Sequence, residues 1–499
     1  TTVATANAAD NATLTVSTTD AKFAGKTVNA YKMFSATVSG DGKAVSYTLT
    51  DEWKPFFKNS VGLTGVTDEN VNDKANDYVS KLKDSTLVAF ATKASNWAQT
   101  KANNITADAT ATVSADASNG KYTATFTGLG YGYYVVAVPG ATLANAKSQY
   151  ATLVSVHSTK VDADIKGDLP TVDKKVQVDG TGKDATDAKI GDTLTFTLTS
   201  TIPDMSAYDT YTFNFKDTLS KGLTFGQVKS VKVENVTLTE NTDYTVTTPT
   251  ASNNNTLTVA MKDFKTKQQA NAGKKITVTY TATLNENAVV GGAGNVNSAK
   301  IQYSNNPSTN GTGESEPSKV RVFTYGFTVD KYTGDQYTDA ATRLAGAEFT
   351  LAHKDGSAIS FVQVSAGSAT ANAVYRVAKA GETGTTTITT PANGKVVFEG
   401  LKNGEYTLTE TEAPAGYNKL ASAIGVKVNG QNNGTDTTNA TVTITYNNDN
   451  GNDYNQTASN GVIPVQNKSG AILPGTGGMG TIAFTVIGVL VIALGVAWT

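Results

Sequence analysis

The sequence predicts a mainly β protein made of tandem β-sandwiches, with one helical insertion and an apolar C-terminal segment. Two patterns carry the β prediction. Polar residues alternate with apolar or aromatic ones in runs such as "TLTFTLTS" (193–200) and "KITVTYTATL" (275–284), which is the period of a half-buried strand. Clusters rich in Asn, Gly and Asp, such as "ASNNN" and "NNDNGND", separate these runs and mark turns.

One stretch departs from this pattern. Between residues 70 and 100, apolar residues recur at the three- and four-residue spacing of a helix instead of at every second position. They are Val71, Ala75, Val79, Leu82, Leu87, Phe90 and Ala91. We therefore expect an α-helical insertion in the first domain.

Composition limits the possible functions. The 499 residues leave room for three or four domains. Charged residues make up 17% and the formal net charge is −2, so no basic surface field is expected to attract nucleic acid. Cysteine is absent, which excludes disulfides, thiolate metal sites and a cysteine nucleophile. The two histidines, His157 and His353, fall in different modules, and we expect no metal and no cofactor.

An internal repeat divides the chain. "FTGLGYGYYVVAV" (126–138) aligns without gaps on "FEGLKNGEYTLTE" (398–410), and both read F-x-G-L-x-x-G-x-Y followed by a strand. Two modules thus share a hairpin, with a different module between them. "KGDLPT" and "ESEPSKVRV" have the composition of junctions. The expected domains are residues 1–165, 166–320 and 321–470, followed by a terminal segment, 471–499.

The sequence ends on an apolar run without charge or proline, Thr481–Trp498. The run is about as long as a bilayer span and has no polar face, which favours a transmembrane helix over a buried one. Shortly before it stand five residues that form an L-P-x-T-G sequence: Leu473, Pro474, Gly475, Thr476 and Gly477.

This ending resembles the cell-wall sorting signal of Gram-positive surface proteins. The resemblance implies that a membrane sortase, a cysteine transpeptidase, cuts between Thr476 and Gly477 and passes the Thr476 acyl group to an amine. The apolar run would retain the substrate at the membrane beside the enzyme. The family's signal ends in a short Lys/Arg tail, which is not found before Thr499. The opening "TTVATANAADN" does not have the pattern of a signal peptide, so an exported protein would begin here after its removal.

The last module carries a second resemblance. "YTLTETEAPAGY" (406–417) resembles the E-box of Cna-B-type domains in sortase-assembled pilins. Upstream, "FTVDKYTGD" places Lys331 on what should be the first strand, and downstream "VIPVQNKSG" places Asn467 on what should be the last. The resemblance implies that Lys331, Glu410 and Asn467 form an intramolecular isopeptide bond. Glu412 lies on the same strand face, but the E-box implies Glu410 as the acid.

The residue types suit this chemistry. A lysine with an ordinary pKa of about 10.4 is a poor nucleophile at neutral pH, and burial among apolar side chains lowers its pKa. The same burial keeps a neighbouring carboxyl protonated, so that it can hydrogen-bond the asparagine carbonyl and shuttle protons. Packing aligns amine and amide, ammonia leaves, and an amide joins two strands. The alternative is that the three residues are ordinary strand residues on a solvated face.

The middle module offers a second trio. "LPTVDKKVQV", "FNFKDTLSKGLTF" and "GNVNSAKIQYSNNP" resemble the middle domain of such pilins, where Lys, Asp and Asn take the three roles. Position by position, the resemblance implies Lys174, Asp217 and Asn297. Lys175 points to the other strand face, and Asn295 is the main competitor for the acyl role.

The first domain is expected to lack such a bond. In the gap-free alignment of the repeat, Val138 falls opposite Glu410, so no carboxylate occupies the acid position. Residues 1–165 should therefore be the least constrained of the three domains.

A polymer would also need an acceptor amine. The family places this lysine just before the middle domain, often in a Tyr-Pro-Lys-Asn motif, which is not found here. By its spacing to Lys174, Lys166 in "VDADIKGDLPTVDKK" is the best match. Lys160 is the second choice.

The resemblance as a whole is to the major shaft subunit of a sortase-assembled pilus with three immunoglobulin-like, Cna-type sandwiches. It implies subunits stacked head to tail on the Gram-positive cell wall, Thr476 of one joined to Lys166 of the next. The implied partners are sortase, identical subunits, minor pilins, peptidoglycan and host surface or matrix molecules, and the chain would be a substrate and not an enzyme. The alternatives are a monomeric wall-anchored adhesin, a minor pilin, or a wall-attached carbohydrate-active enzyme, for which no paired carboxylates among aromatics are evident.

Overall fold

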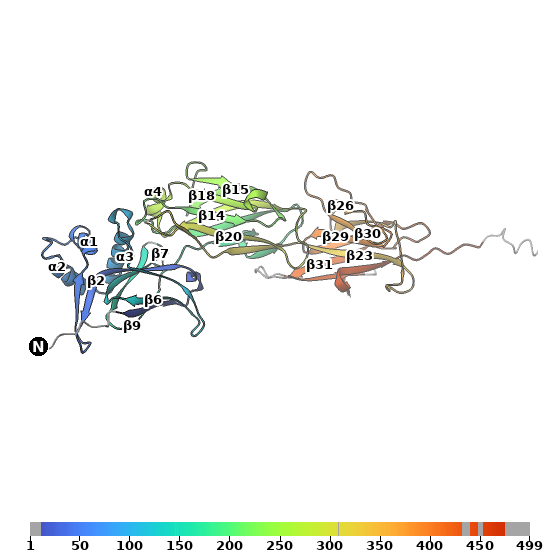
Figure 1. Ribbon diagram of the computed structural model, residues 1–499. Helices are drawn as coiled ribbons and strands as arrows, with labels where there is room; N and C mark the ends of the chain where they lie inside the picture. The colour runs from blue at the N-terminus through green and yellow to red at the C-terminus, as the bar shows by residue number, and fades with distance from the viewer. Residues whose placement is uncertain are drawn as a thin grey trace, which may run out of the picture. The chain divides into compact units, whose positions relative to one another are not determined.

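The computed structural model describes residues 11–144, 146, 148–307, 309–431, 440–447 and 453–474. These residues are mainly β, as the alternating pattern predicts, and their strands form six sheets (Figure 1). The chain divides into two compact units, Thr1–Thr324 with Gln431–Thr441 and Tyr325–Gly430 with Val442–Thr499. The first unit holds two β-sandwiches, and the second holds one.

The C-terminal apolar run lies outside the described residues, and so does the predicted transmembrane helix. The same holds for three residues of the L-P-x-T-G sequence, Gly475, Thr476 and Gly477. Within the described ranges, no helix has the length and apolar character needed to cross a membrane.

The first sandwich consists of two sheets. One sheet has the strand order β5 (Ser114–Asp116), β6 (Lys121–Leu129), β1 (Ala12–Thr18), β9 (Lys160–Asp164). The other has the order β3 (Val45–Leu49), β2 (Thr27–Val38), β7 (Gly132–Thr142), β8 (Gln149–Val156), with β4 (Ala109–Thr112) paired to β2. Strand β1 thus lies between β6, which is antiparallel to it, and β9, which is parallel.

Helices cover the outer face of the β7 sheet (Figure 1). They are α1 (Lys54–Asn59), α2 (Val71–Ser80) and α3 (Ser85–Gln99), with 3-10 turns at Ala21–Phe23, Asp51–Trp53 and Lys101–Asn103. α2 and α3 confirm the helical insertion predicted between residues 70 and 100, whereas α1 is too short to give a periodic signal in the sequence. Strand β7 is buried on both faces because Tyr134, Val136 and Val138 face the β6 sheet, while Val135 and Ala137 face the helices.

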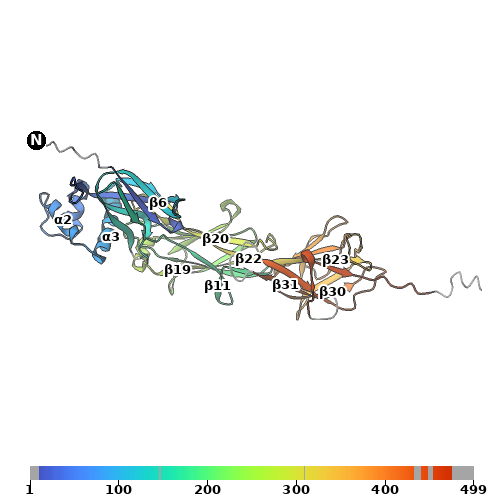
Figure 2. The same cartoon turned by 90° about the horizontal axis from the view of Figure 1, so that it is seen from below.

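The second sandwich of the first unit spans residues 173–323. One sheet has the order β11 (Thr181–Lys183), β10 (Asp173–Val178), β13 (Thr193–Thr201), β19 (Lys275–Leu284), β15 (Leu223–Val233), β16 (Val236–Thr237). The other has the order β12 (Ala185–Asp187), β22 (Ser318–Phe323), β20 (Asn295–Ser304), β14 (Phe213–Thr218), β18 (Thr256–Met261), β17 (Tyr244–Thr247), with β21 (Thr312–Glu314) paired to β20. α4 (Phe264–Gln268) and 3-10 turns at Ala251–Asn253 and Gln269–Asn271 lie between strands. Figure 2 shows β19 and β20, one from each sheet.

Alternation of side chains builds this core. Along β19 every second residue is buried: Ile276, Val278, Tyr280, Ala282 and Leu284. The threonines between them point away from the core, and their branched side chains suit a half-buried pleated surface. The predicted period of two therefore has a direct structural cause in the two faces of the sheet.

The second unit is one sandwich. Its first sheet has the order β24 (Thr342–Arg343), β23 (Tyr325–Thr333), β29 (Lys395–Leu401), β27 (Ala373–Val377), β26 (Phe361–Ser365), with β34 (Val462–Gln466) paired to β23. Its second sheet has the order β28 (Ile388–Thr389), β25 (Glu348–His353), β30 (Gly404–Glu412), β31 (Ile424–Gln431), β32 (Thr441–Tyr446), β33 (Gln456–Thr457). A 3-10 turn at Ser459–Gly461 precedes β34, which runs parallel to β23.

The internal repeat forms the same corner in two sandwiches. In each case the chain crosses from one sheet to the other, from β6 to β7 and from β29 to β30. The hydroxyl of Tyr134 donates a hydrogen bond to the carbonyl oxygen of Gly130, and that of Tyr406 to Lys402, each over 2.6 Å. A tyrosine that bonds back to the backbone in this way fixes a sheet-to-sheet corner in many sandwiches.

Candidate functional site: two buried lysine clusters

The core of the second unit brings together three predicted residues. Lys331 lies on β23, Glu410 lies on β30 of the opposite sheet, and Asn467 follows the last residue of β34. Lys331 is paired in register with Val465, two residues before Asn467, so the lysine and the asparagine lie close together on neighbouring strands. The cluster therefore spans both sheets.

One carboxyl lies between the amine and the amide in this cluster. The Nζ atom of Lys331 is 3.0 Å from Oε2 of Glu410, and both side chains are 0% exposed. The Nδ2 atom of Asn467 donates hydrogen bonds to Oε1 of Glu410 (2.9 Å) and to the carbonyl oxygen of Asn418 (3.0 Å). The backbone N–H of Leu420 donates to the same Oε1 atom over 2.9 Å. The glutamate thus contacts both groups that would react.

The carbonyl oxygen of the Asn467 side chain is buried and finds no hydrogen-bond donor among the described residues. A buried polar atom without a partner costs about 1–3 kcal/mol and needs an explanation in a folded protein. The donated Nδ2 hydrogens fix the plane of the amide. The side-chain carbonyl of Asn467 is therefore buried beside a lysine with no hydrogen-bond donor on its oxygen among the described residues.

Burial makes Lys331 a better nucleophile. It lowers the pKa of the amine to about 8, although the charge of Glu410 opposes the shift. At pH 7 about a tenth of such an amine is neutral, against a few molecules in ten thousand at the ordinary pKa. The ring of Phe349, with its centroid 5.8 Å from Nζ, forms part of the apolar surroundings.

A second cluster lies in the core of the middle sandwich. Lys174 lies on β10, whereas Asp217 and Asn297 lie on β14 and β20 of the opposite sheet. Asp217 is paired with Ala299, so Asn297 is its diagonal neighbour on the same face. All three side chains belong to residues that are 0% exposed. Asn467 follows the last strand of its sandwich, whereas Asn297 lies on β20 and is followed by β21 and β22.

A tyrosine completes this middle cluster. Lys174 Nζ donates hydrogen bonds to Oδ2 of Asp217 and, over 2.7 Å, to the hydroxyl oxygen of Tyr280. The Tyr280 hydroxyl donates to the same Oδ2 atom over 2.7 Å. Asn297 Nδ2 donates to the Tyr280 oxygen over 3.3 Å, while the backbone N–H of Ser220 lies 3.4 Å from the Asn297 carbonyl oxygen.

The surroundings of Lys174 disfavour its charge. Burial lowers the pKa of Lys174, and Asp217 opposes the shift. Burial also raises the pKa of Tyr280 well above its ordinary value, and the charge of Asp217 adds to this effect. The ring centroids of Phe196 and Tyr280 lie 4.7 and 4.8 Å from the Lys174 nitrogen. The amine is thus enclosed by aromatic faces and one carboxyl.

The competing residues lie elsewhere. Lys175 is 33% exposed and forms an ion pair with Asp184 over 2.5 Å. Asn295 is buried, but its amide bonds the backbone of Val289 and Val322 and no member of the cluster. Glu412 is exposed at the end of β30.

The first sandwich has other residues at the corresponding positions. The first and third sandwiches can be compared strand by strand. Leu14 pairs with Phe126 in the first, as Phe327 pairs with Phe398 in the third. Leu14 therefore corresponds to Phe327, and Thr18, four residues later, corresponds to Lys331. β1 pairs with β9 in parallel, as β23 pairs with β34, and by this pairing Gly167 corresponds to Asn467. By the internal repeat, Val138 corresponds to Glu410. A Cβ atom on Gly167 would lie 2.6 Å from Cγ of Tyr150, so an asparagine does not fit there.

The predicted acceptor lysines are both accessible. Lys160 is the first residue of β9 and Lys166 follows the end of that strand, and both are exposed. Lys166 lies between two buried residues, Ile165 and Gly167. Of the L-P-x-T-G sequence, the described residues include Leu473, which is 83% exposed, and Pro474, which is exposed.

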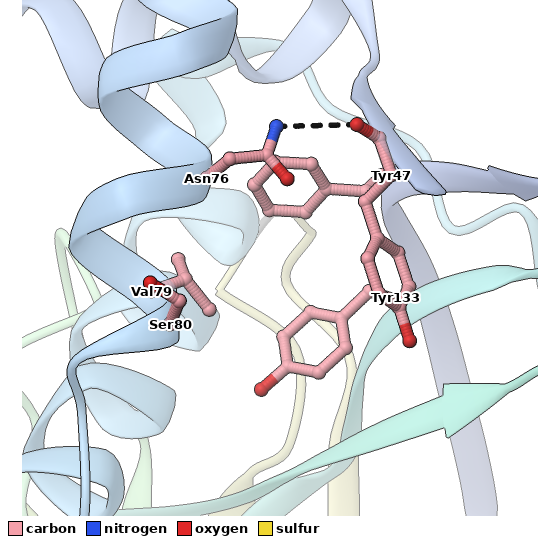
Figure 3. A pocket seen from close by; sticks show the side chains of 6 residues that line it. Tyr47, Asn76, Val79, Ser80 and Tyr133 are labelled. Atoms are coloured by element: carbon pink, nitrogen blue, oxygen red, sulfur yellow. Dashed lines mark hydrogen bonds between the residues drawn. The ribbon is translucent and has the colours of Figure 1, made fainter. Parts of the chain in front are cut away.

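A small cavity lies between α2 and the β7 sheet (Figure 3). Its volume is about 230 Å³, and Asn76 Nδ2 donates a hydrogen bond to the Tyr47 carbonyl oxygen at its edge over 3.1 Å. It is lined by Phe34, Tyr47, Asn76, Val79, Ser80 and Tyr133. The volume is below the range of about 300–1,000 Å³ for small-molecule sites. None of the six lining side chains is a carboxyl, so this cavity does not offer the acid pair of a glycoside hydrolase.

Two family models match parts of the two sandwiches that hold these clusters. Residues 190–307 match the Gram-positive pilin backbone subunit 2, Cna-B-like domain, and residues 335–445 match the prealbumin-like fold domain. Together with the relatives below, these matches support a Gram-positive backbone pilin. Asp217, Tyr280 and Asn297 lie within the first match, and Glu410 lies within the second.

Other proteins are similar to this chain over part of its length. The trypsin-resistant surface T6 protein of Streptococcus pyogenes serotype M6 is 25% identical over 279 residues. That alignment covers 50% of this chain and 44% of the T6 protein, so the chain matches less than half the length of this curated relative.

Solved pilin structures are also similar to it. The T6 backbone pilin of Streptococcus pyogenes has 20% identity and a TM-score of 0.48, covering 85% of this chain and 83% of that chain. The full-length major pilin SpaD of Corynebacterium diphtheriae has 21% identity and a TM-score of 0.41, covering 82% of this chain and 88% of that chain.

Sequence reasoning missed Tyr280 and the backbone groups that bind Glu410 and the two asparagine amides. One signal was available. Among the inward-facing residues of β19, Tyr280 alone carries a polar side-chain group, since the others are Ile276, Val278, Ala282 and Leu284. A buried tyrosine hydroxyl needs a hydrogen-bond partner. The partners themselves come from strands far apart in sequence, so the sequence alone did not reveal them.

Proposed function

We propose that this chain is the structural shaft subunit of a covalently polymerised pilus, stabilised by two intramolecular isopeptide bonds. The observation that carries the proposal is the pair of buried clusters. Lys331 and Lys174 are each fully buried beside a carboxyl, and an asparagine amide belongs to the same hydrogen-bonded or packed group. Burying an ammonium and a carboxylate costs several kcal/mol, and bond formation would remove the lysine charge.

The chemistry at each cluster is a single-turnover amide exchange. The neutral lysine amine attacks the carbonyl carbon of the asparagine side chain, and the new C–N bond forms as the bond to Nδ2 breaks. The carboxyl carries one proton from the amine to the departing nitrogen, which leaves as ammonia. Alignment of the groups in the folded core replaces an external catalyst.

Such bonds suit a fibre under tension. Each would close a loop of more than 100 residues, a constraint worth about 4–5 kcal/mol by the loop-closure model. In the second unit the bond would join β23 to the parallel strand β34, the first and last strands of the sandwich. In the middle sandwich it would tie β10 to β20 and so join the two sheets. Force would then load a covalent link instead of peeling a strand away.

Polymerisation would use the L-P-x-T-G sequence. We infer that sortase joins Thr476 of one subunit to Lys166 of the next, with Lys160 as the second choice, and that the apolar run holds the precursor at the membrane. The finished fibre would be anchored to peptidoglycan on the cell surface, with minor pilins and host surface or matrix molecules as further partners. The exposure of Lys166 supports its role as acceptor.

We also retain the division into domains 1–165, 166–320 and 321–470. What supports it is the strand pairing, which keeps within three groups that span 12–164, 173–323 and 325–466. The terminal segment, 471–499, would be the sorting signal.

Intact mass of the full chain tests the proposal. Two bonds predict a mass below the sequence mass by two ammonia molecules. A chain at its full sequence mass would overturn the proposal of internal bonds.

Boiling in denaturant tests the polymer. Cells that make the chain together with sortase should yield a ladder of covalent multimers. A single band would favour a monomeric wall-anchored adhesin or a minor pilin instead.

A further inference from the structure

The two clusters differ in how far their acids reach. In the second unit, Glu410 contacts the lysine with Oε2 and the asparagine amide with Oε1. In the middle sandwich, Asp217 contacts Lys174 through Oδ2, and its other oxygen, Oδ1, has no hydrogen-bond partner among the described residues. The Asn297 amide nitrogen bonds Tyr280 instead. Aspartate is one methylene shorter than glutamate, and the tyrosine hydroxyl bridges the remaining gap.

We propose that Tyr280 is a catalytic residue of the middle site, whose hydroxyl relays a proton from the Lys174 amine to the departing Asn297 nitrogen. This inference rests on the proposed isopeptide chemistry. At the middle site the acid alone does not reach both the amine and the amide, and Tyr280 is the group that connects them. The hydroxyl oxygen lies 2.7 Å from Lys174 Nζ and 3.3 Å from Asn297 Nδ2. Both distances suit direct proton transfer once the groups draw together.

The transfer balances as follows. Lys174 Nζ attacks the side-chain carbonyl carbon of Asn297. One N–H proton passes to the Tyr280 oxygen while the Tyr280 hydroxyl proton passes to Asp217 Oδ2 along their hydrogen bond of 2.7 Å. As the bond between that carbon and Nδ2 breaks, the Tyr280 hydroxyl gives a proton to Nδ2 and regains one from Asp217. The products are the Lys174–Asn297 amide and one ammonia molecule. Tyr280 and Asp217 end in their starting protonation states.

The surroundings of Tyr280 keep it in place and neutral for this relay. It lies on β19, the strand between β13 and β15, and its ring stacks on Phe196 with 5.3 Å between centroids and 22° between planes. Because the hydroxyl pKa is raised by burial, the group remains a proton donor at neutral pH. The backbone N–H of Ser220 points at the Asn297 carbonyl oxygen over 3.4 Å, where negative charge develops during attack.

The second unit supplies an internal control. The groups that contact its carboxyl and amide are Lys331, the backbone N–H of Leu420 and the Asn418 carbonyl oxygen. Glu410 bridges amine and amide without a hydroxyl between them. Loss of a tyrosine hydroxyl from the middle site should therefore leave the bond of the second unit unaffected.

The test follows the mass of newly synthesised full chain over time, with peptide mapping to assign each bond. In Tyr280→Phe the Lys174–Asn297 bond should form at least about 100-fold more slowly, the usual effect of losing an acid–base group. The Lys331–Asn467 bond should form at the wild-type rate. The matched control is Tyr208→Phe, which removes a buried hydroxyl from the same sandwich that has no hydrogen-bond partner among the described residues. It should form both bonds at the wild-type rate.

The outcomes separate two failures. If wild-type chain lacks the middle bond, the proposed isopeptide chemistry is wrong at this site. If wild-type chain has it and Tyr280→Phe forms it equally fast, Tyr280 is not part of the reaction, and the pilin proposal still stands.

A folding defect in Tyr280→Phe would be detected by near-ultraviolet circular dichroism, with Lys174→Met as a reference that is unable to form the bond. In that case 3-fluorotyrosine at position 280 replaces the variant, because it keeps the hydrogen bonds and lowers the hydroxyl pKa. A relay predicts a changed rate and a shifted pH profile. A purely structural role predicts the wild-type rate and profile, which would overturn the inference.

Discussion

The amide nitrogen of Asn467 lies 2.9 Å from Oε1 of Glu410, while the other oxygen of the same carboxyl is 3.0 Å from Lys331. A single acid therefore contacts both the amine and the amide that would exchange. In the proposed exchange this carboxyl would carry the proton from nucleophile to leaving group, in a core where both charged side chains are 0% exposed. The predictions below test what that arrangement does.

Replacing Glu410 by alanine should remove one bond. The mass deficit of the full chain is expected to fall from two ammonia molecules to one, because the proton carrier of the second unit is lost. The melting temperature of that unit should fall by roughly 10 °C or more, given a constraint of about 4–5 kcal/mol. Glu412→Ala is the matched control, since Glu412 is exposed on the same strand. This variant should keep the mass deficit of two ammonia molecules.

The two adjacent lysines of β10 should behave differently. Lys174→Ala is expected to abolish the middle bond, whereas Lys175→Ala should leave it intact, because Lys175 is on the solvated face beside Asp184. Mass spectrometry with peptide mapping reads out both variants. Equal mass deficits in the two variants would contradict the assignment of Lys174.

Stability without the bond should depend on pH. In Asn467→Ala the Lys331 amine stays free, with a pKa of about 8 in the folded state against about 10.4 when unfolded. The unfolded chain then binds more protons between these values, so the free energy of unfolding should rise with pH from about 8 to about 10.4. The gain is at most about 3 kcal/mol.

The second variant for this measurement is Lys331→Met combined with Asn467→Ala. Denaturant titrations at several pH values give the difference between the two variants, which isolates the contribution of Lys331. A difference that stays flat, or that falls with rising pH, would show that burial does not disfavour the lysine charge.

The acceptor lysine is testable in cells that carry the matching sortase. Lys166→Ala is expected to abolish the covalent ladder on denaturing gels, because no amine remains at the predicted junction. Lys160→Ala is the control and should polymerise normally. The reverse pattern would make Lys160 the acceptor.

The first sandwich should be the weak point under force. Thr18, Val138 and Gly167 stand where the second unit has its lysine, acid and asparagine, so we expect no covalent link in this sandwich. Pulling on a single chain from both ends should extend the first sandwich and leave the other two folded. Extension of a second sandwich at similar force would argue against its bond.

Much of the fold was readable from local patterns. The alternation along residues 275–284 predicts a strand because a sheet has two faces, and the spacing of Val71, Ala75 and Val79 predicts a helix because a helix has one buried stripe. α1 was not predicted because a helix of six residues is too short to show a helical repeat of apolar residues. The candidate trios were found because resemblance to a family fixed which of many lysines and asparagines to consider.

The sequence by itself determined the residue types, their order and the strand period, since these depend on neighbours along the chain. Only the tertiary structure decided which side chains meet. It set Lys174 beside Asp217 and brought in Tyr280, because these contacts join strands 43 and 106 residues apart in sequence. It also left Asn295 bonded to the backbone of Val289 and Val322. Burial, which lowers the pKa of both lysines, likewise arises only when two sheets close over them and exclude water.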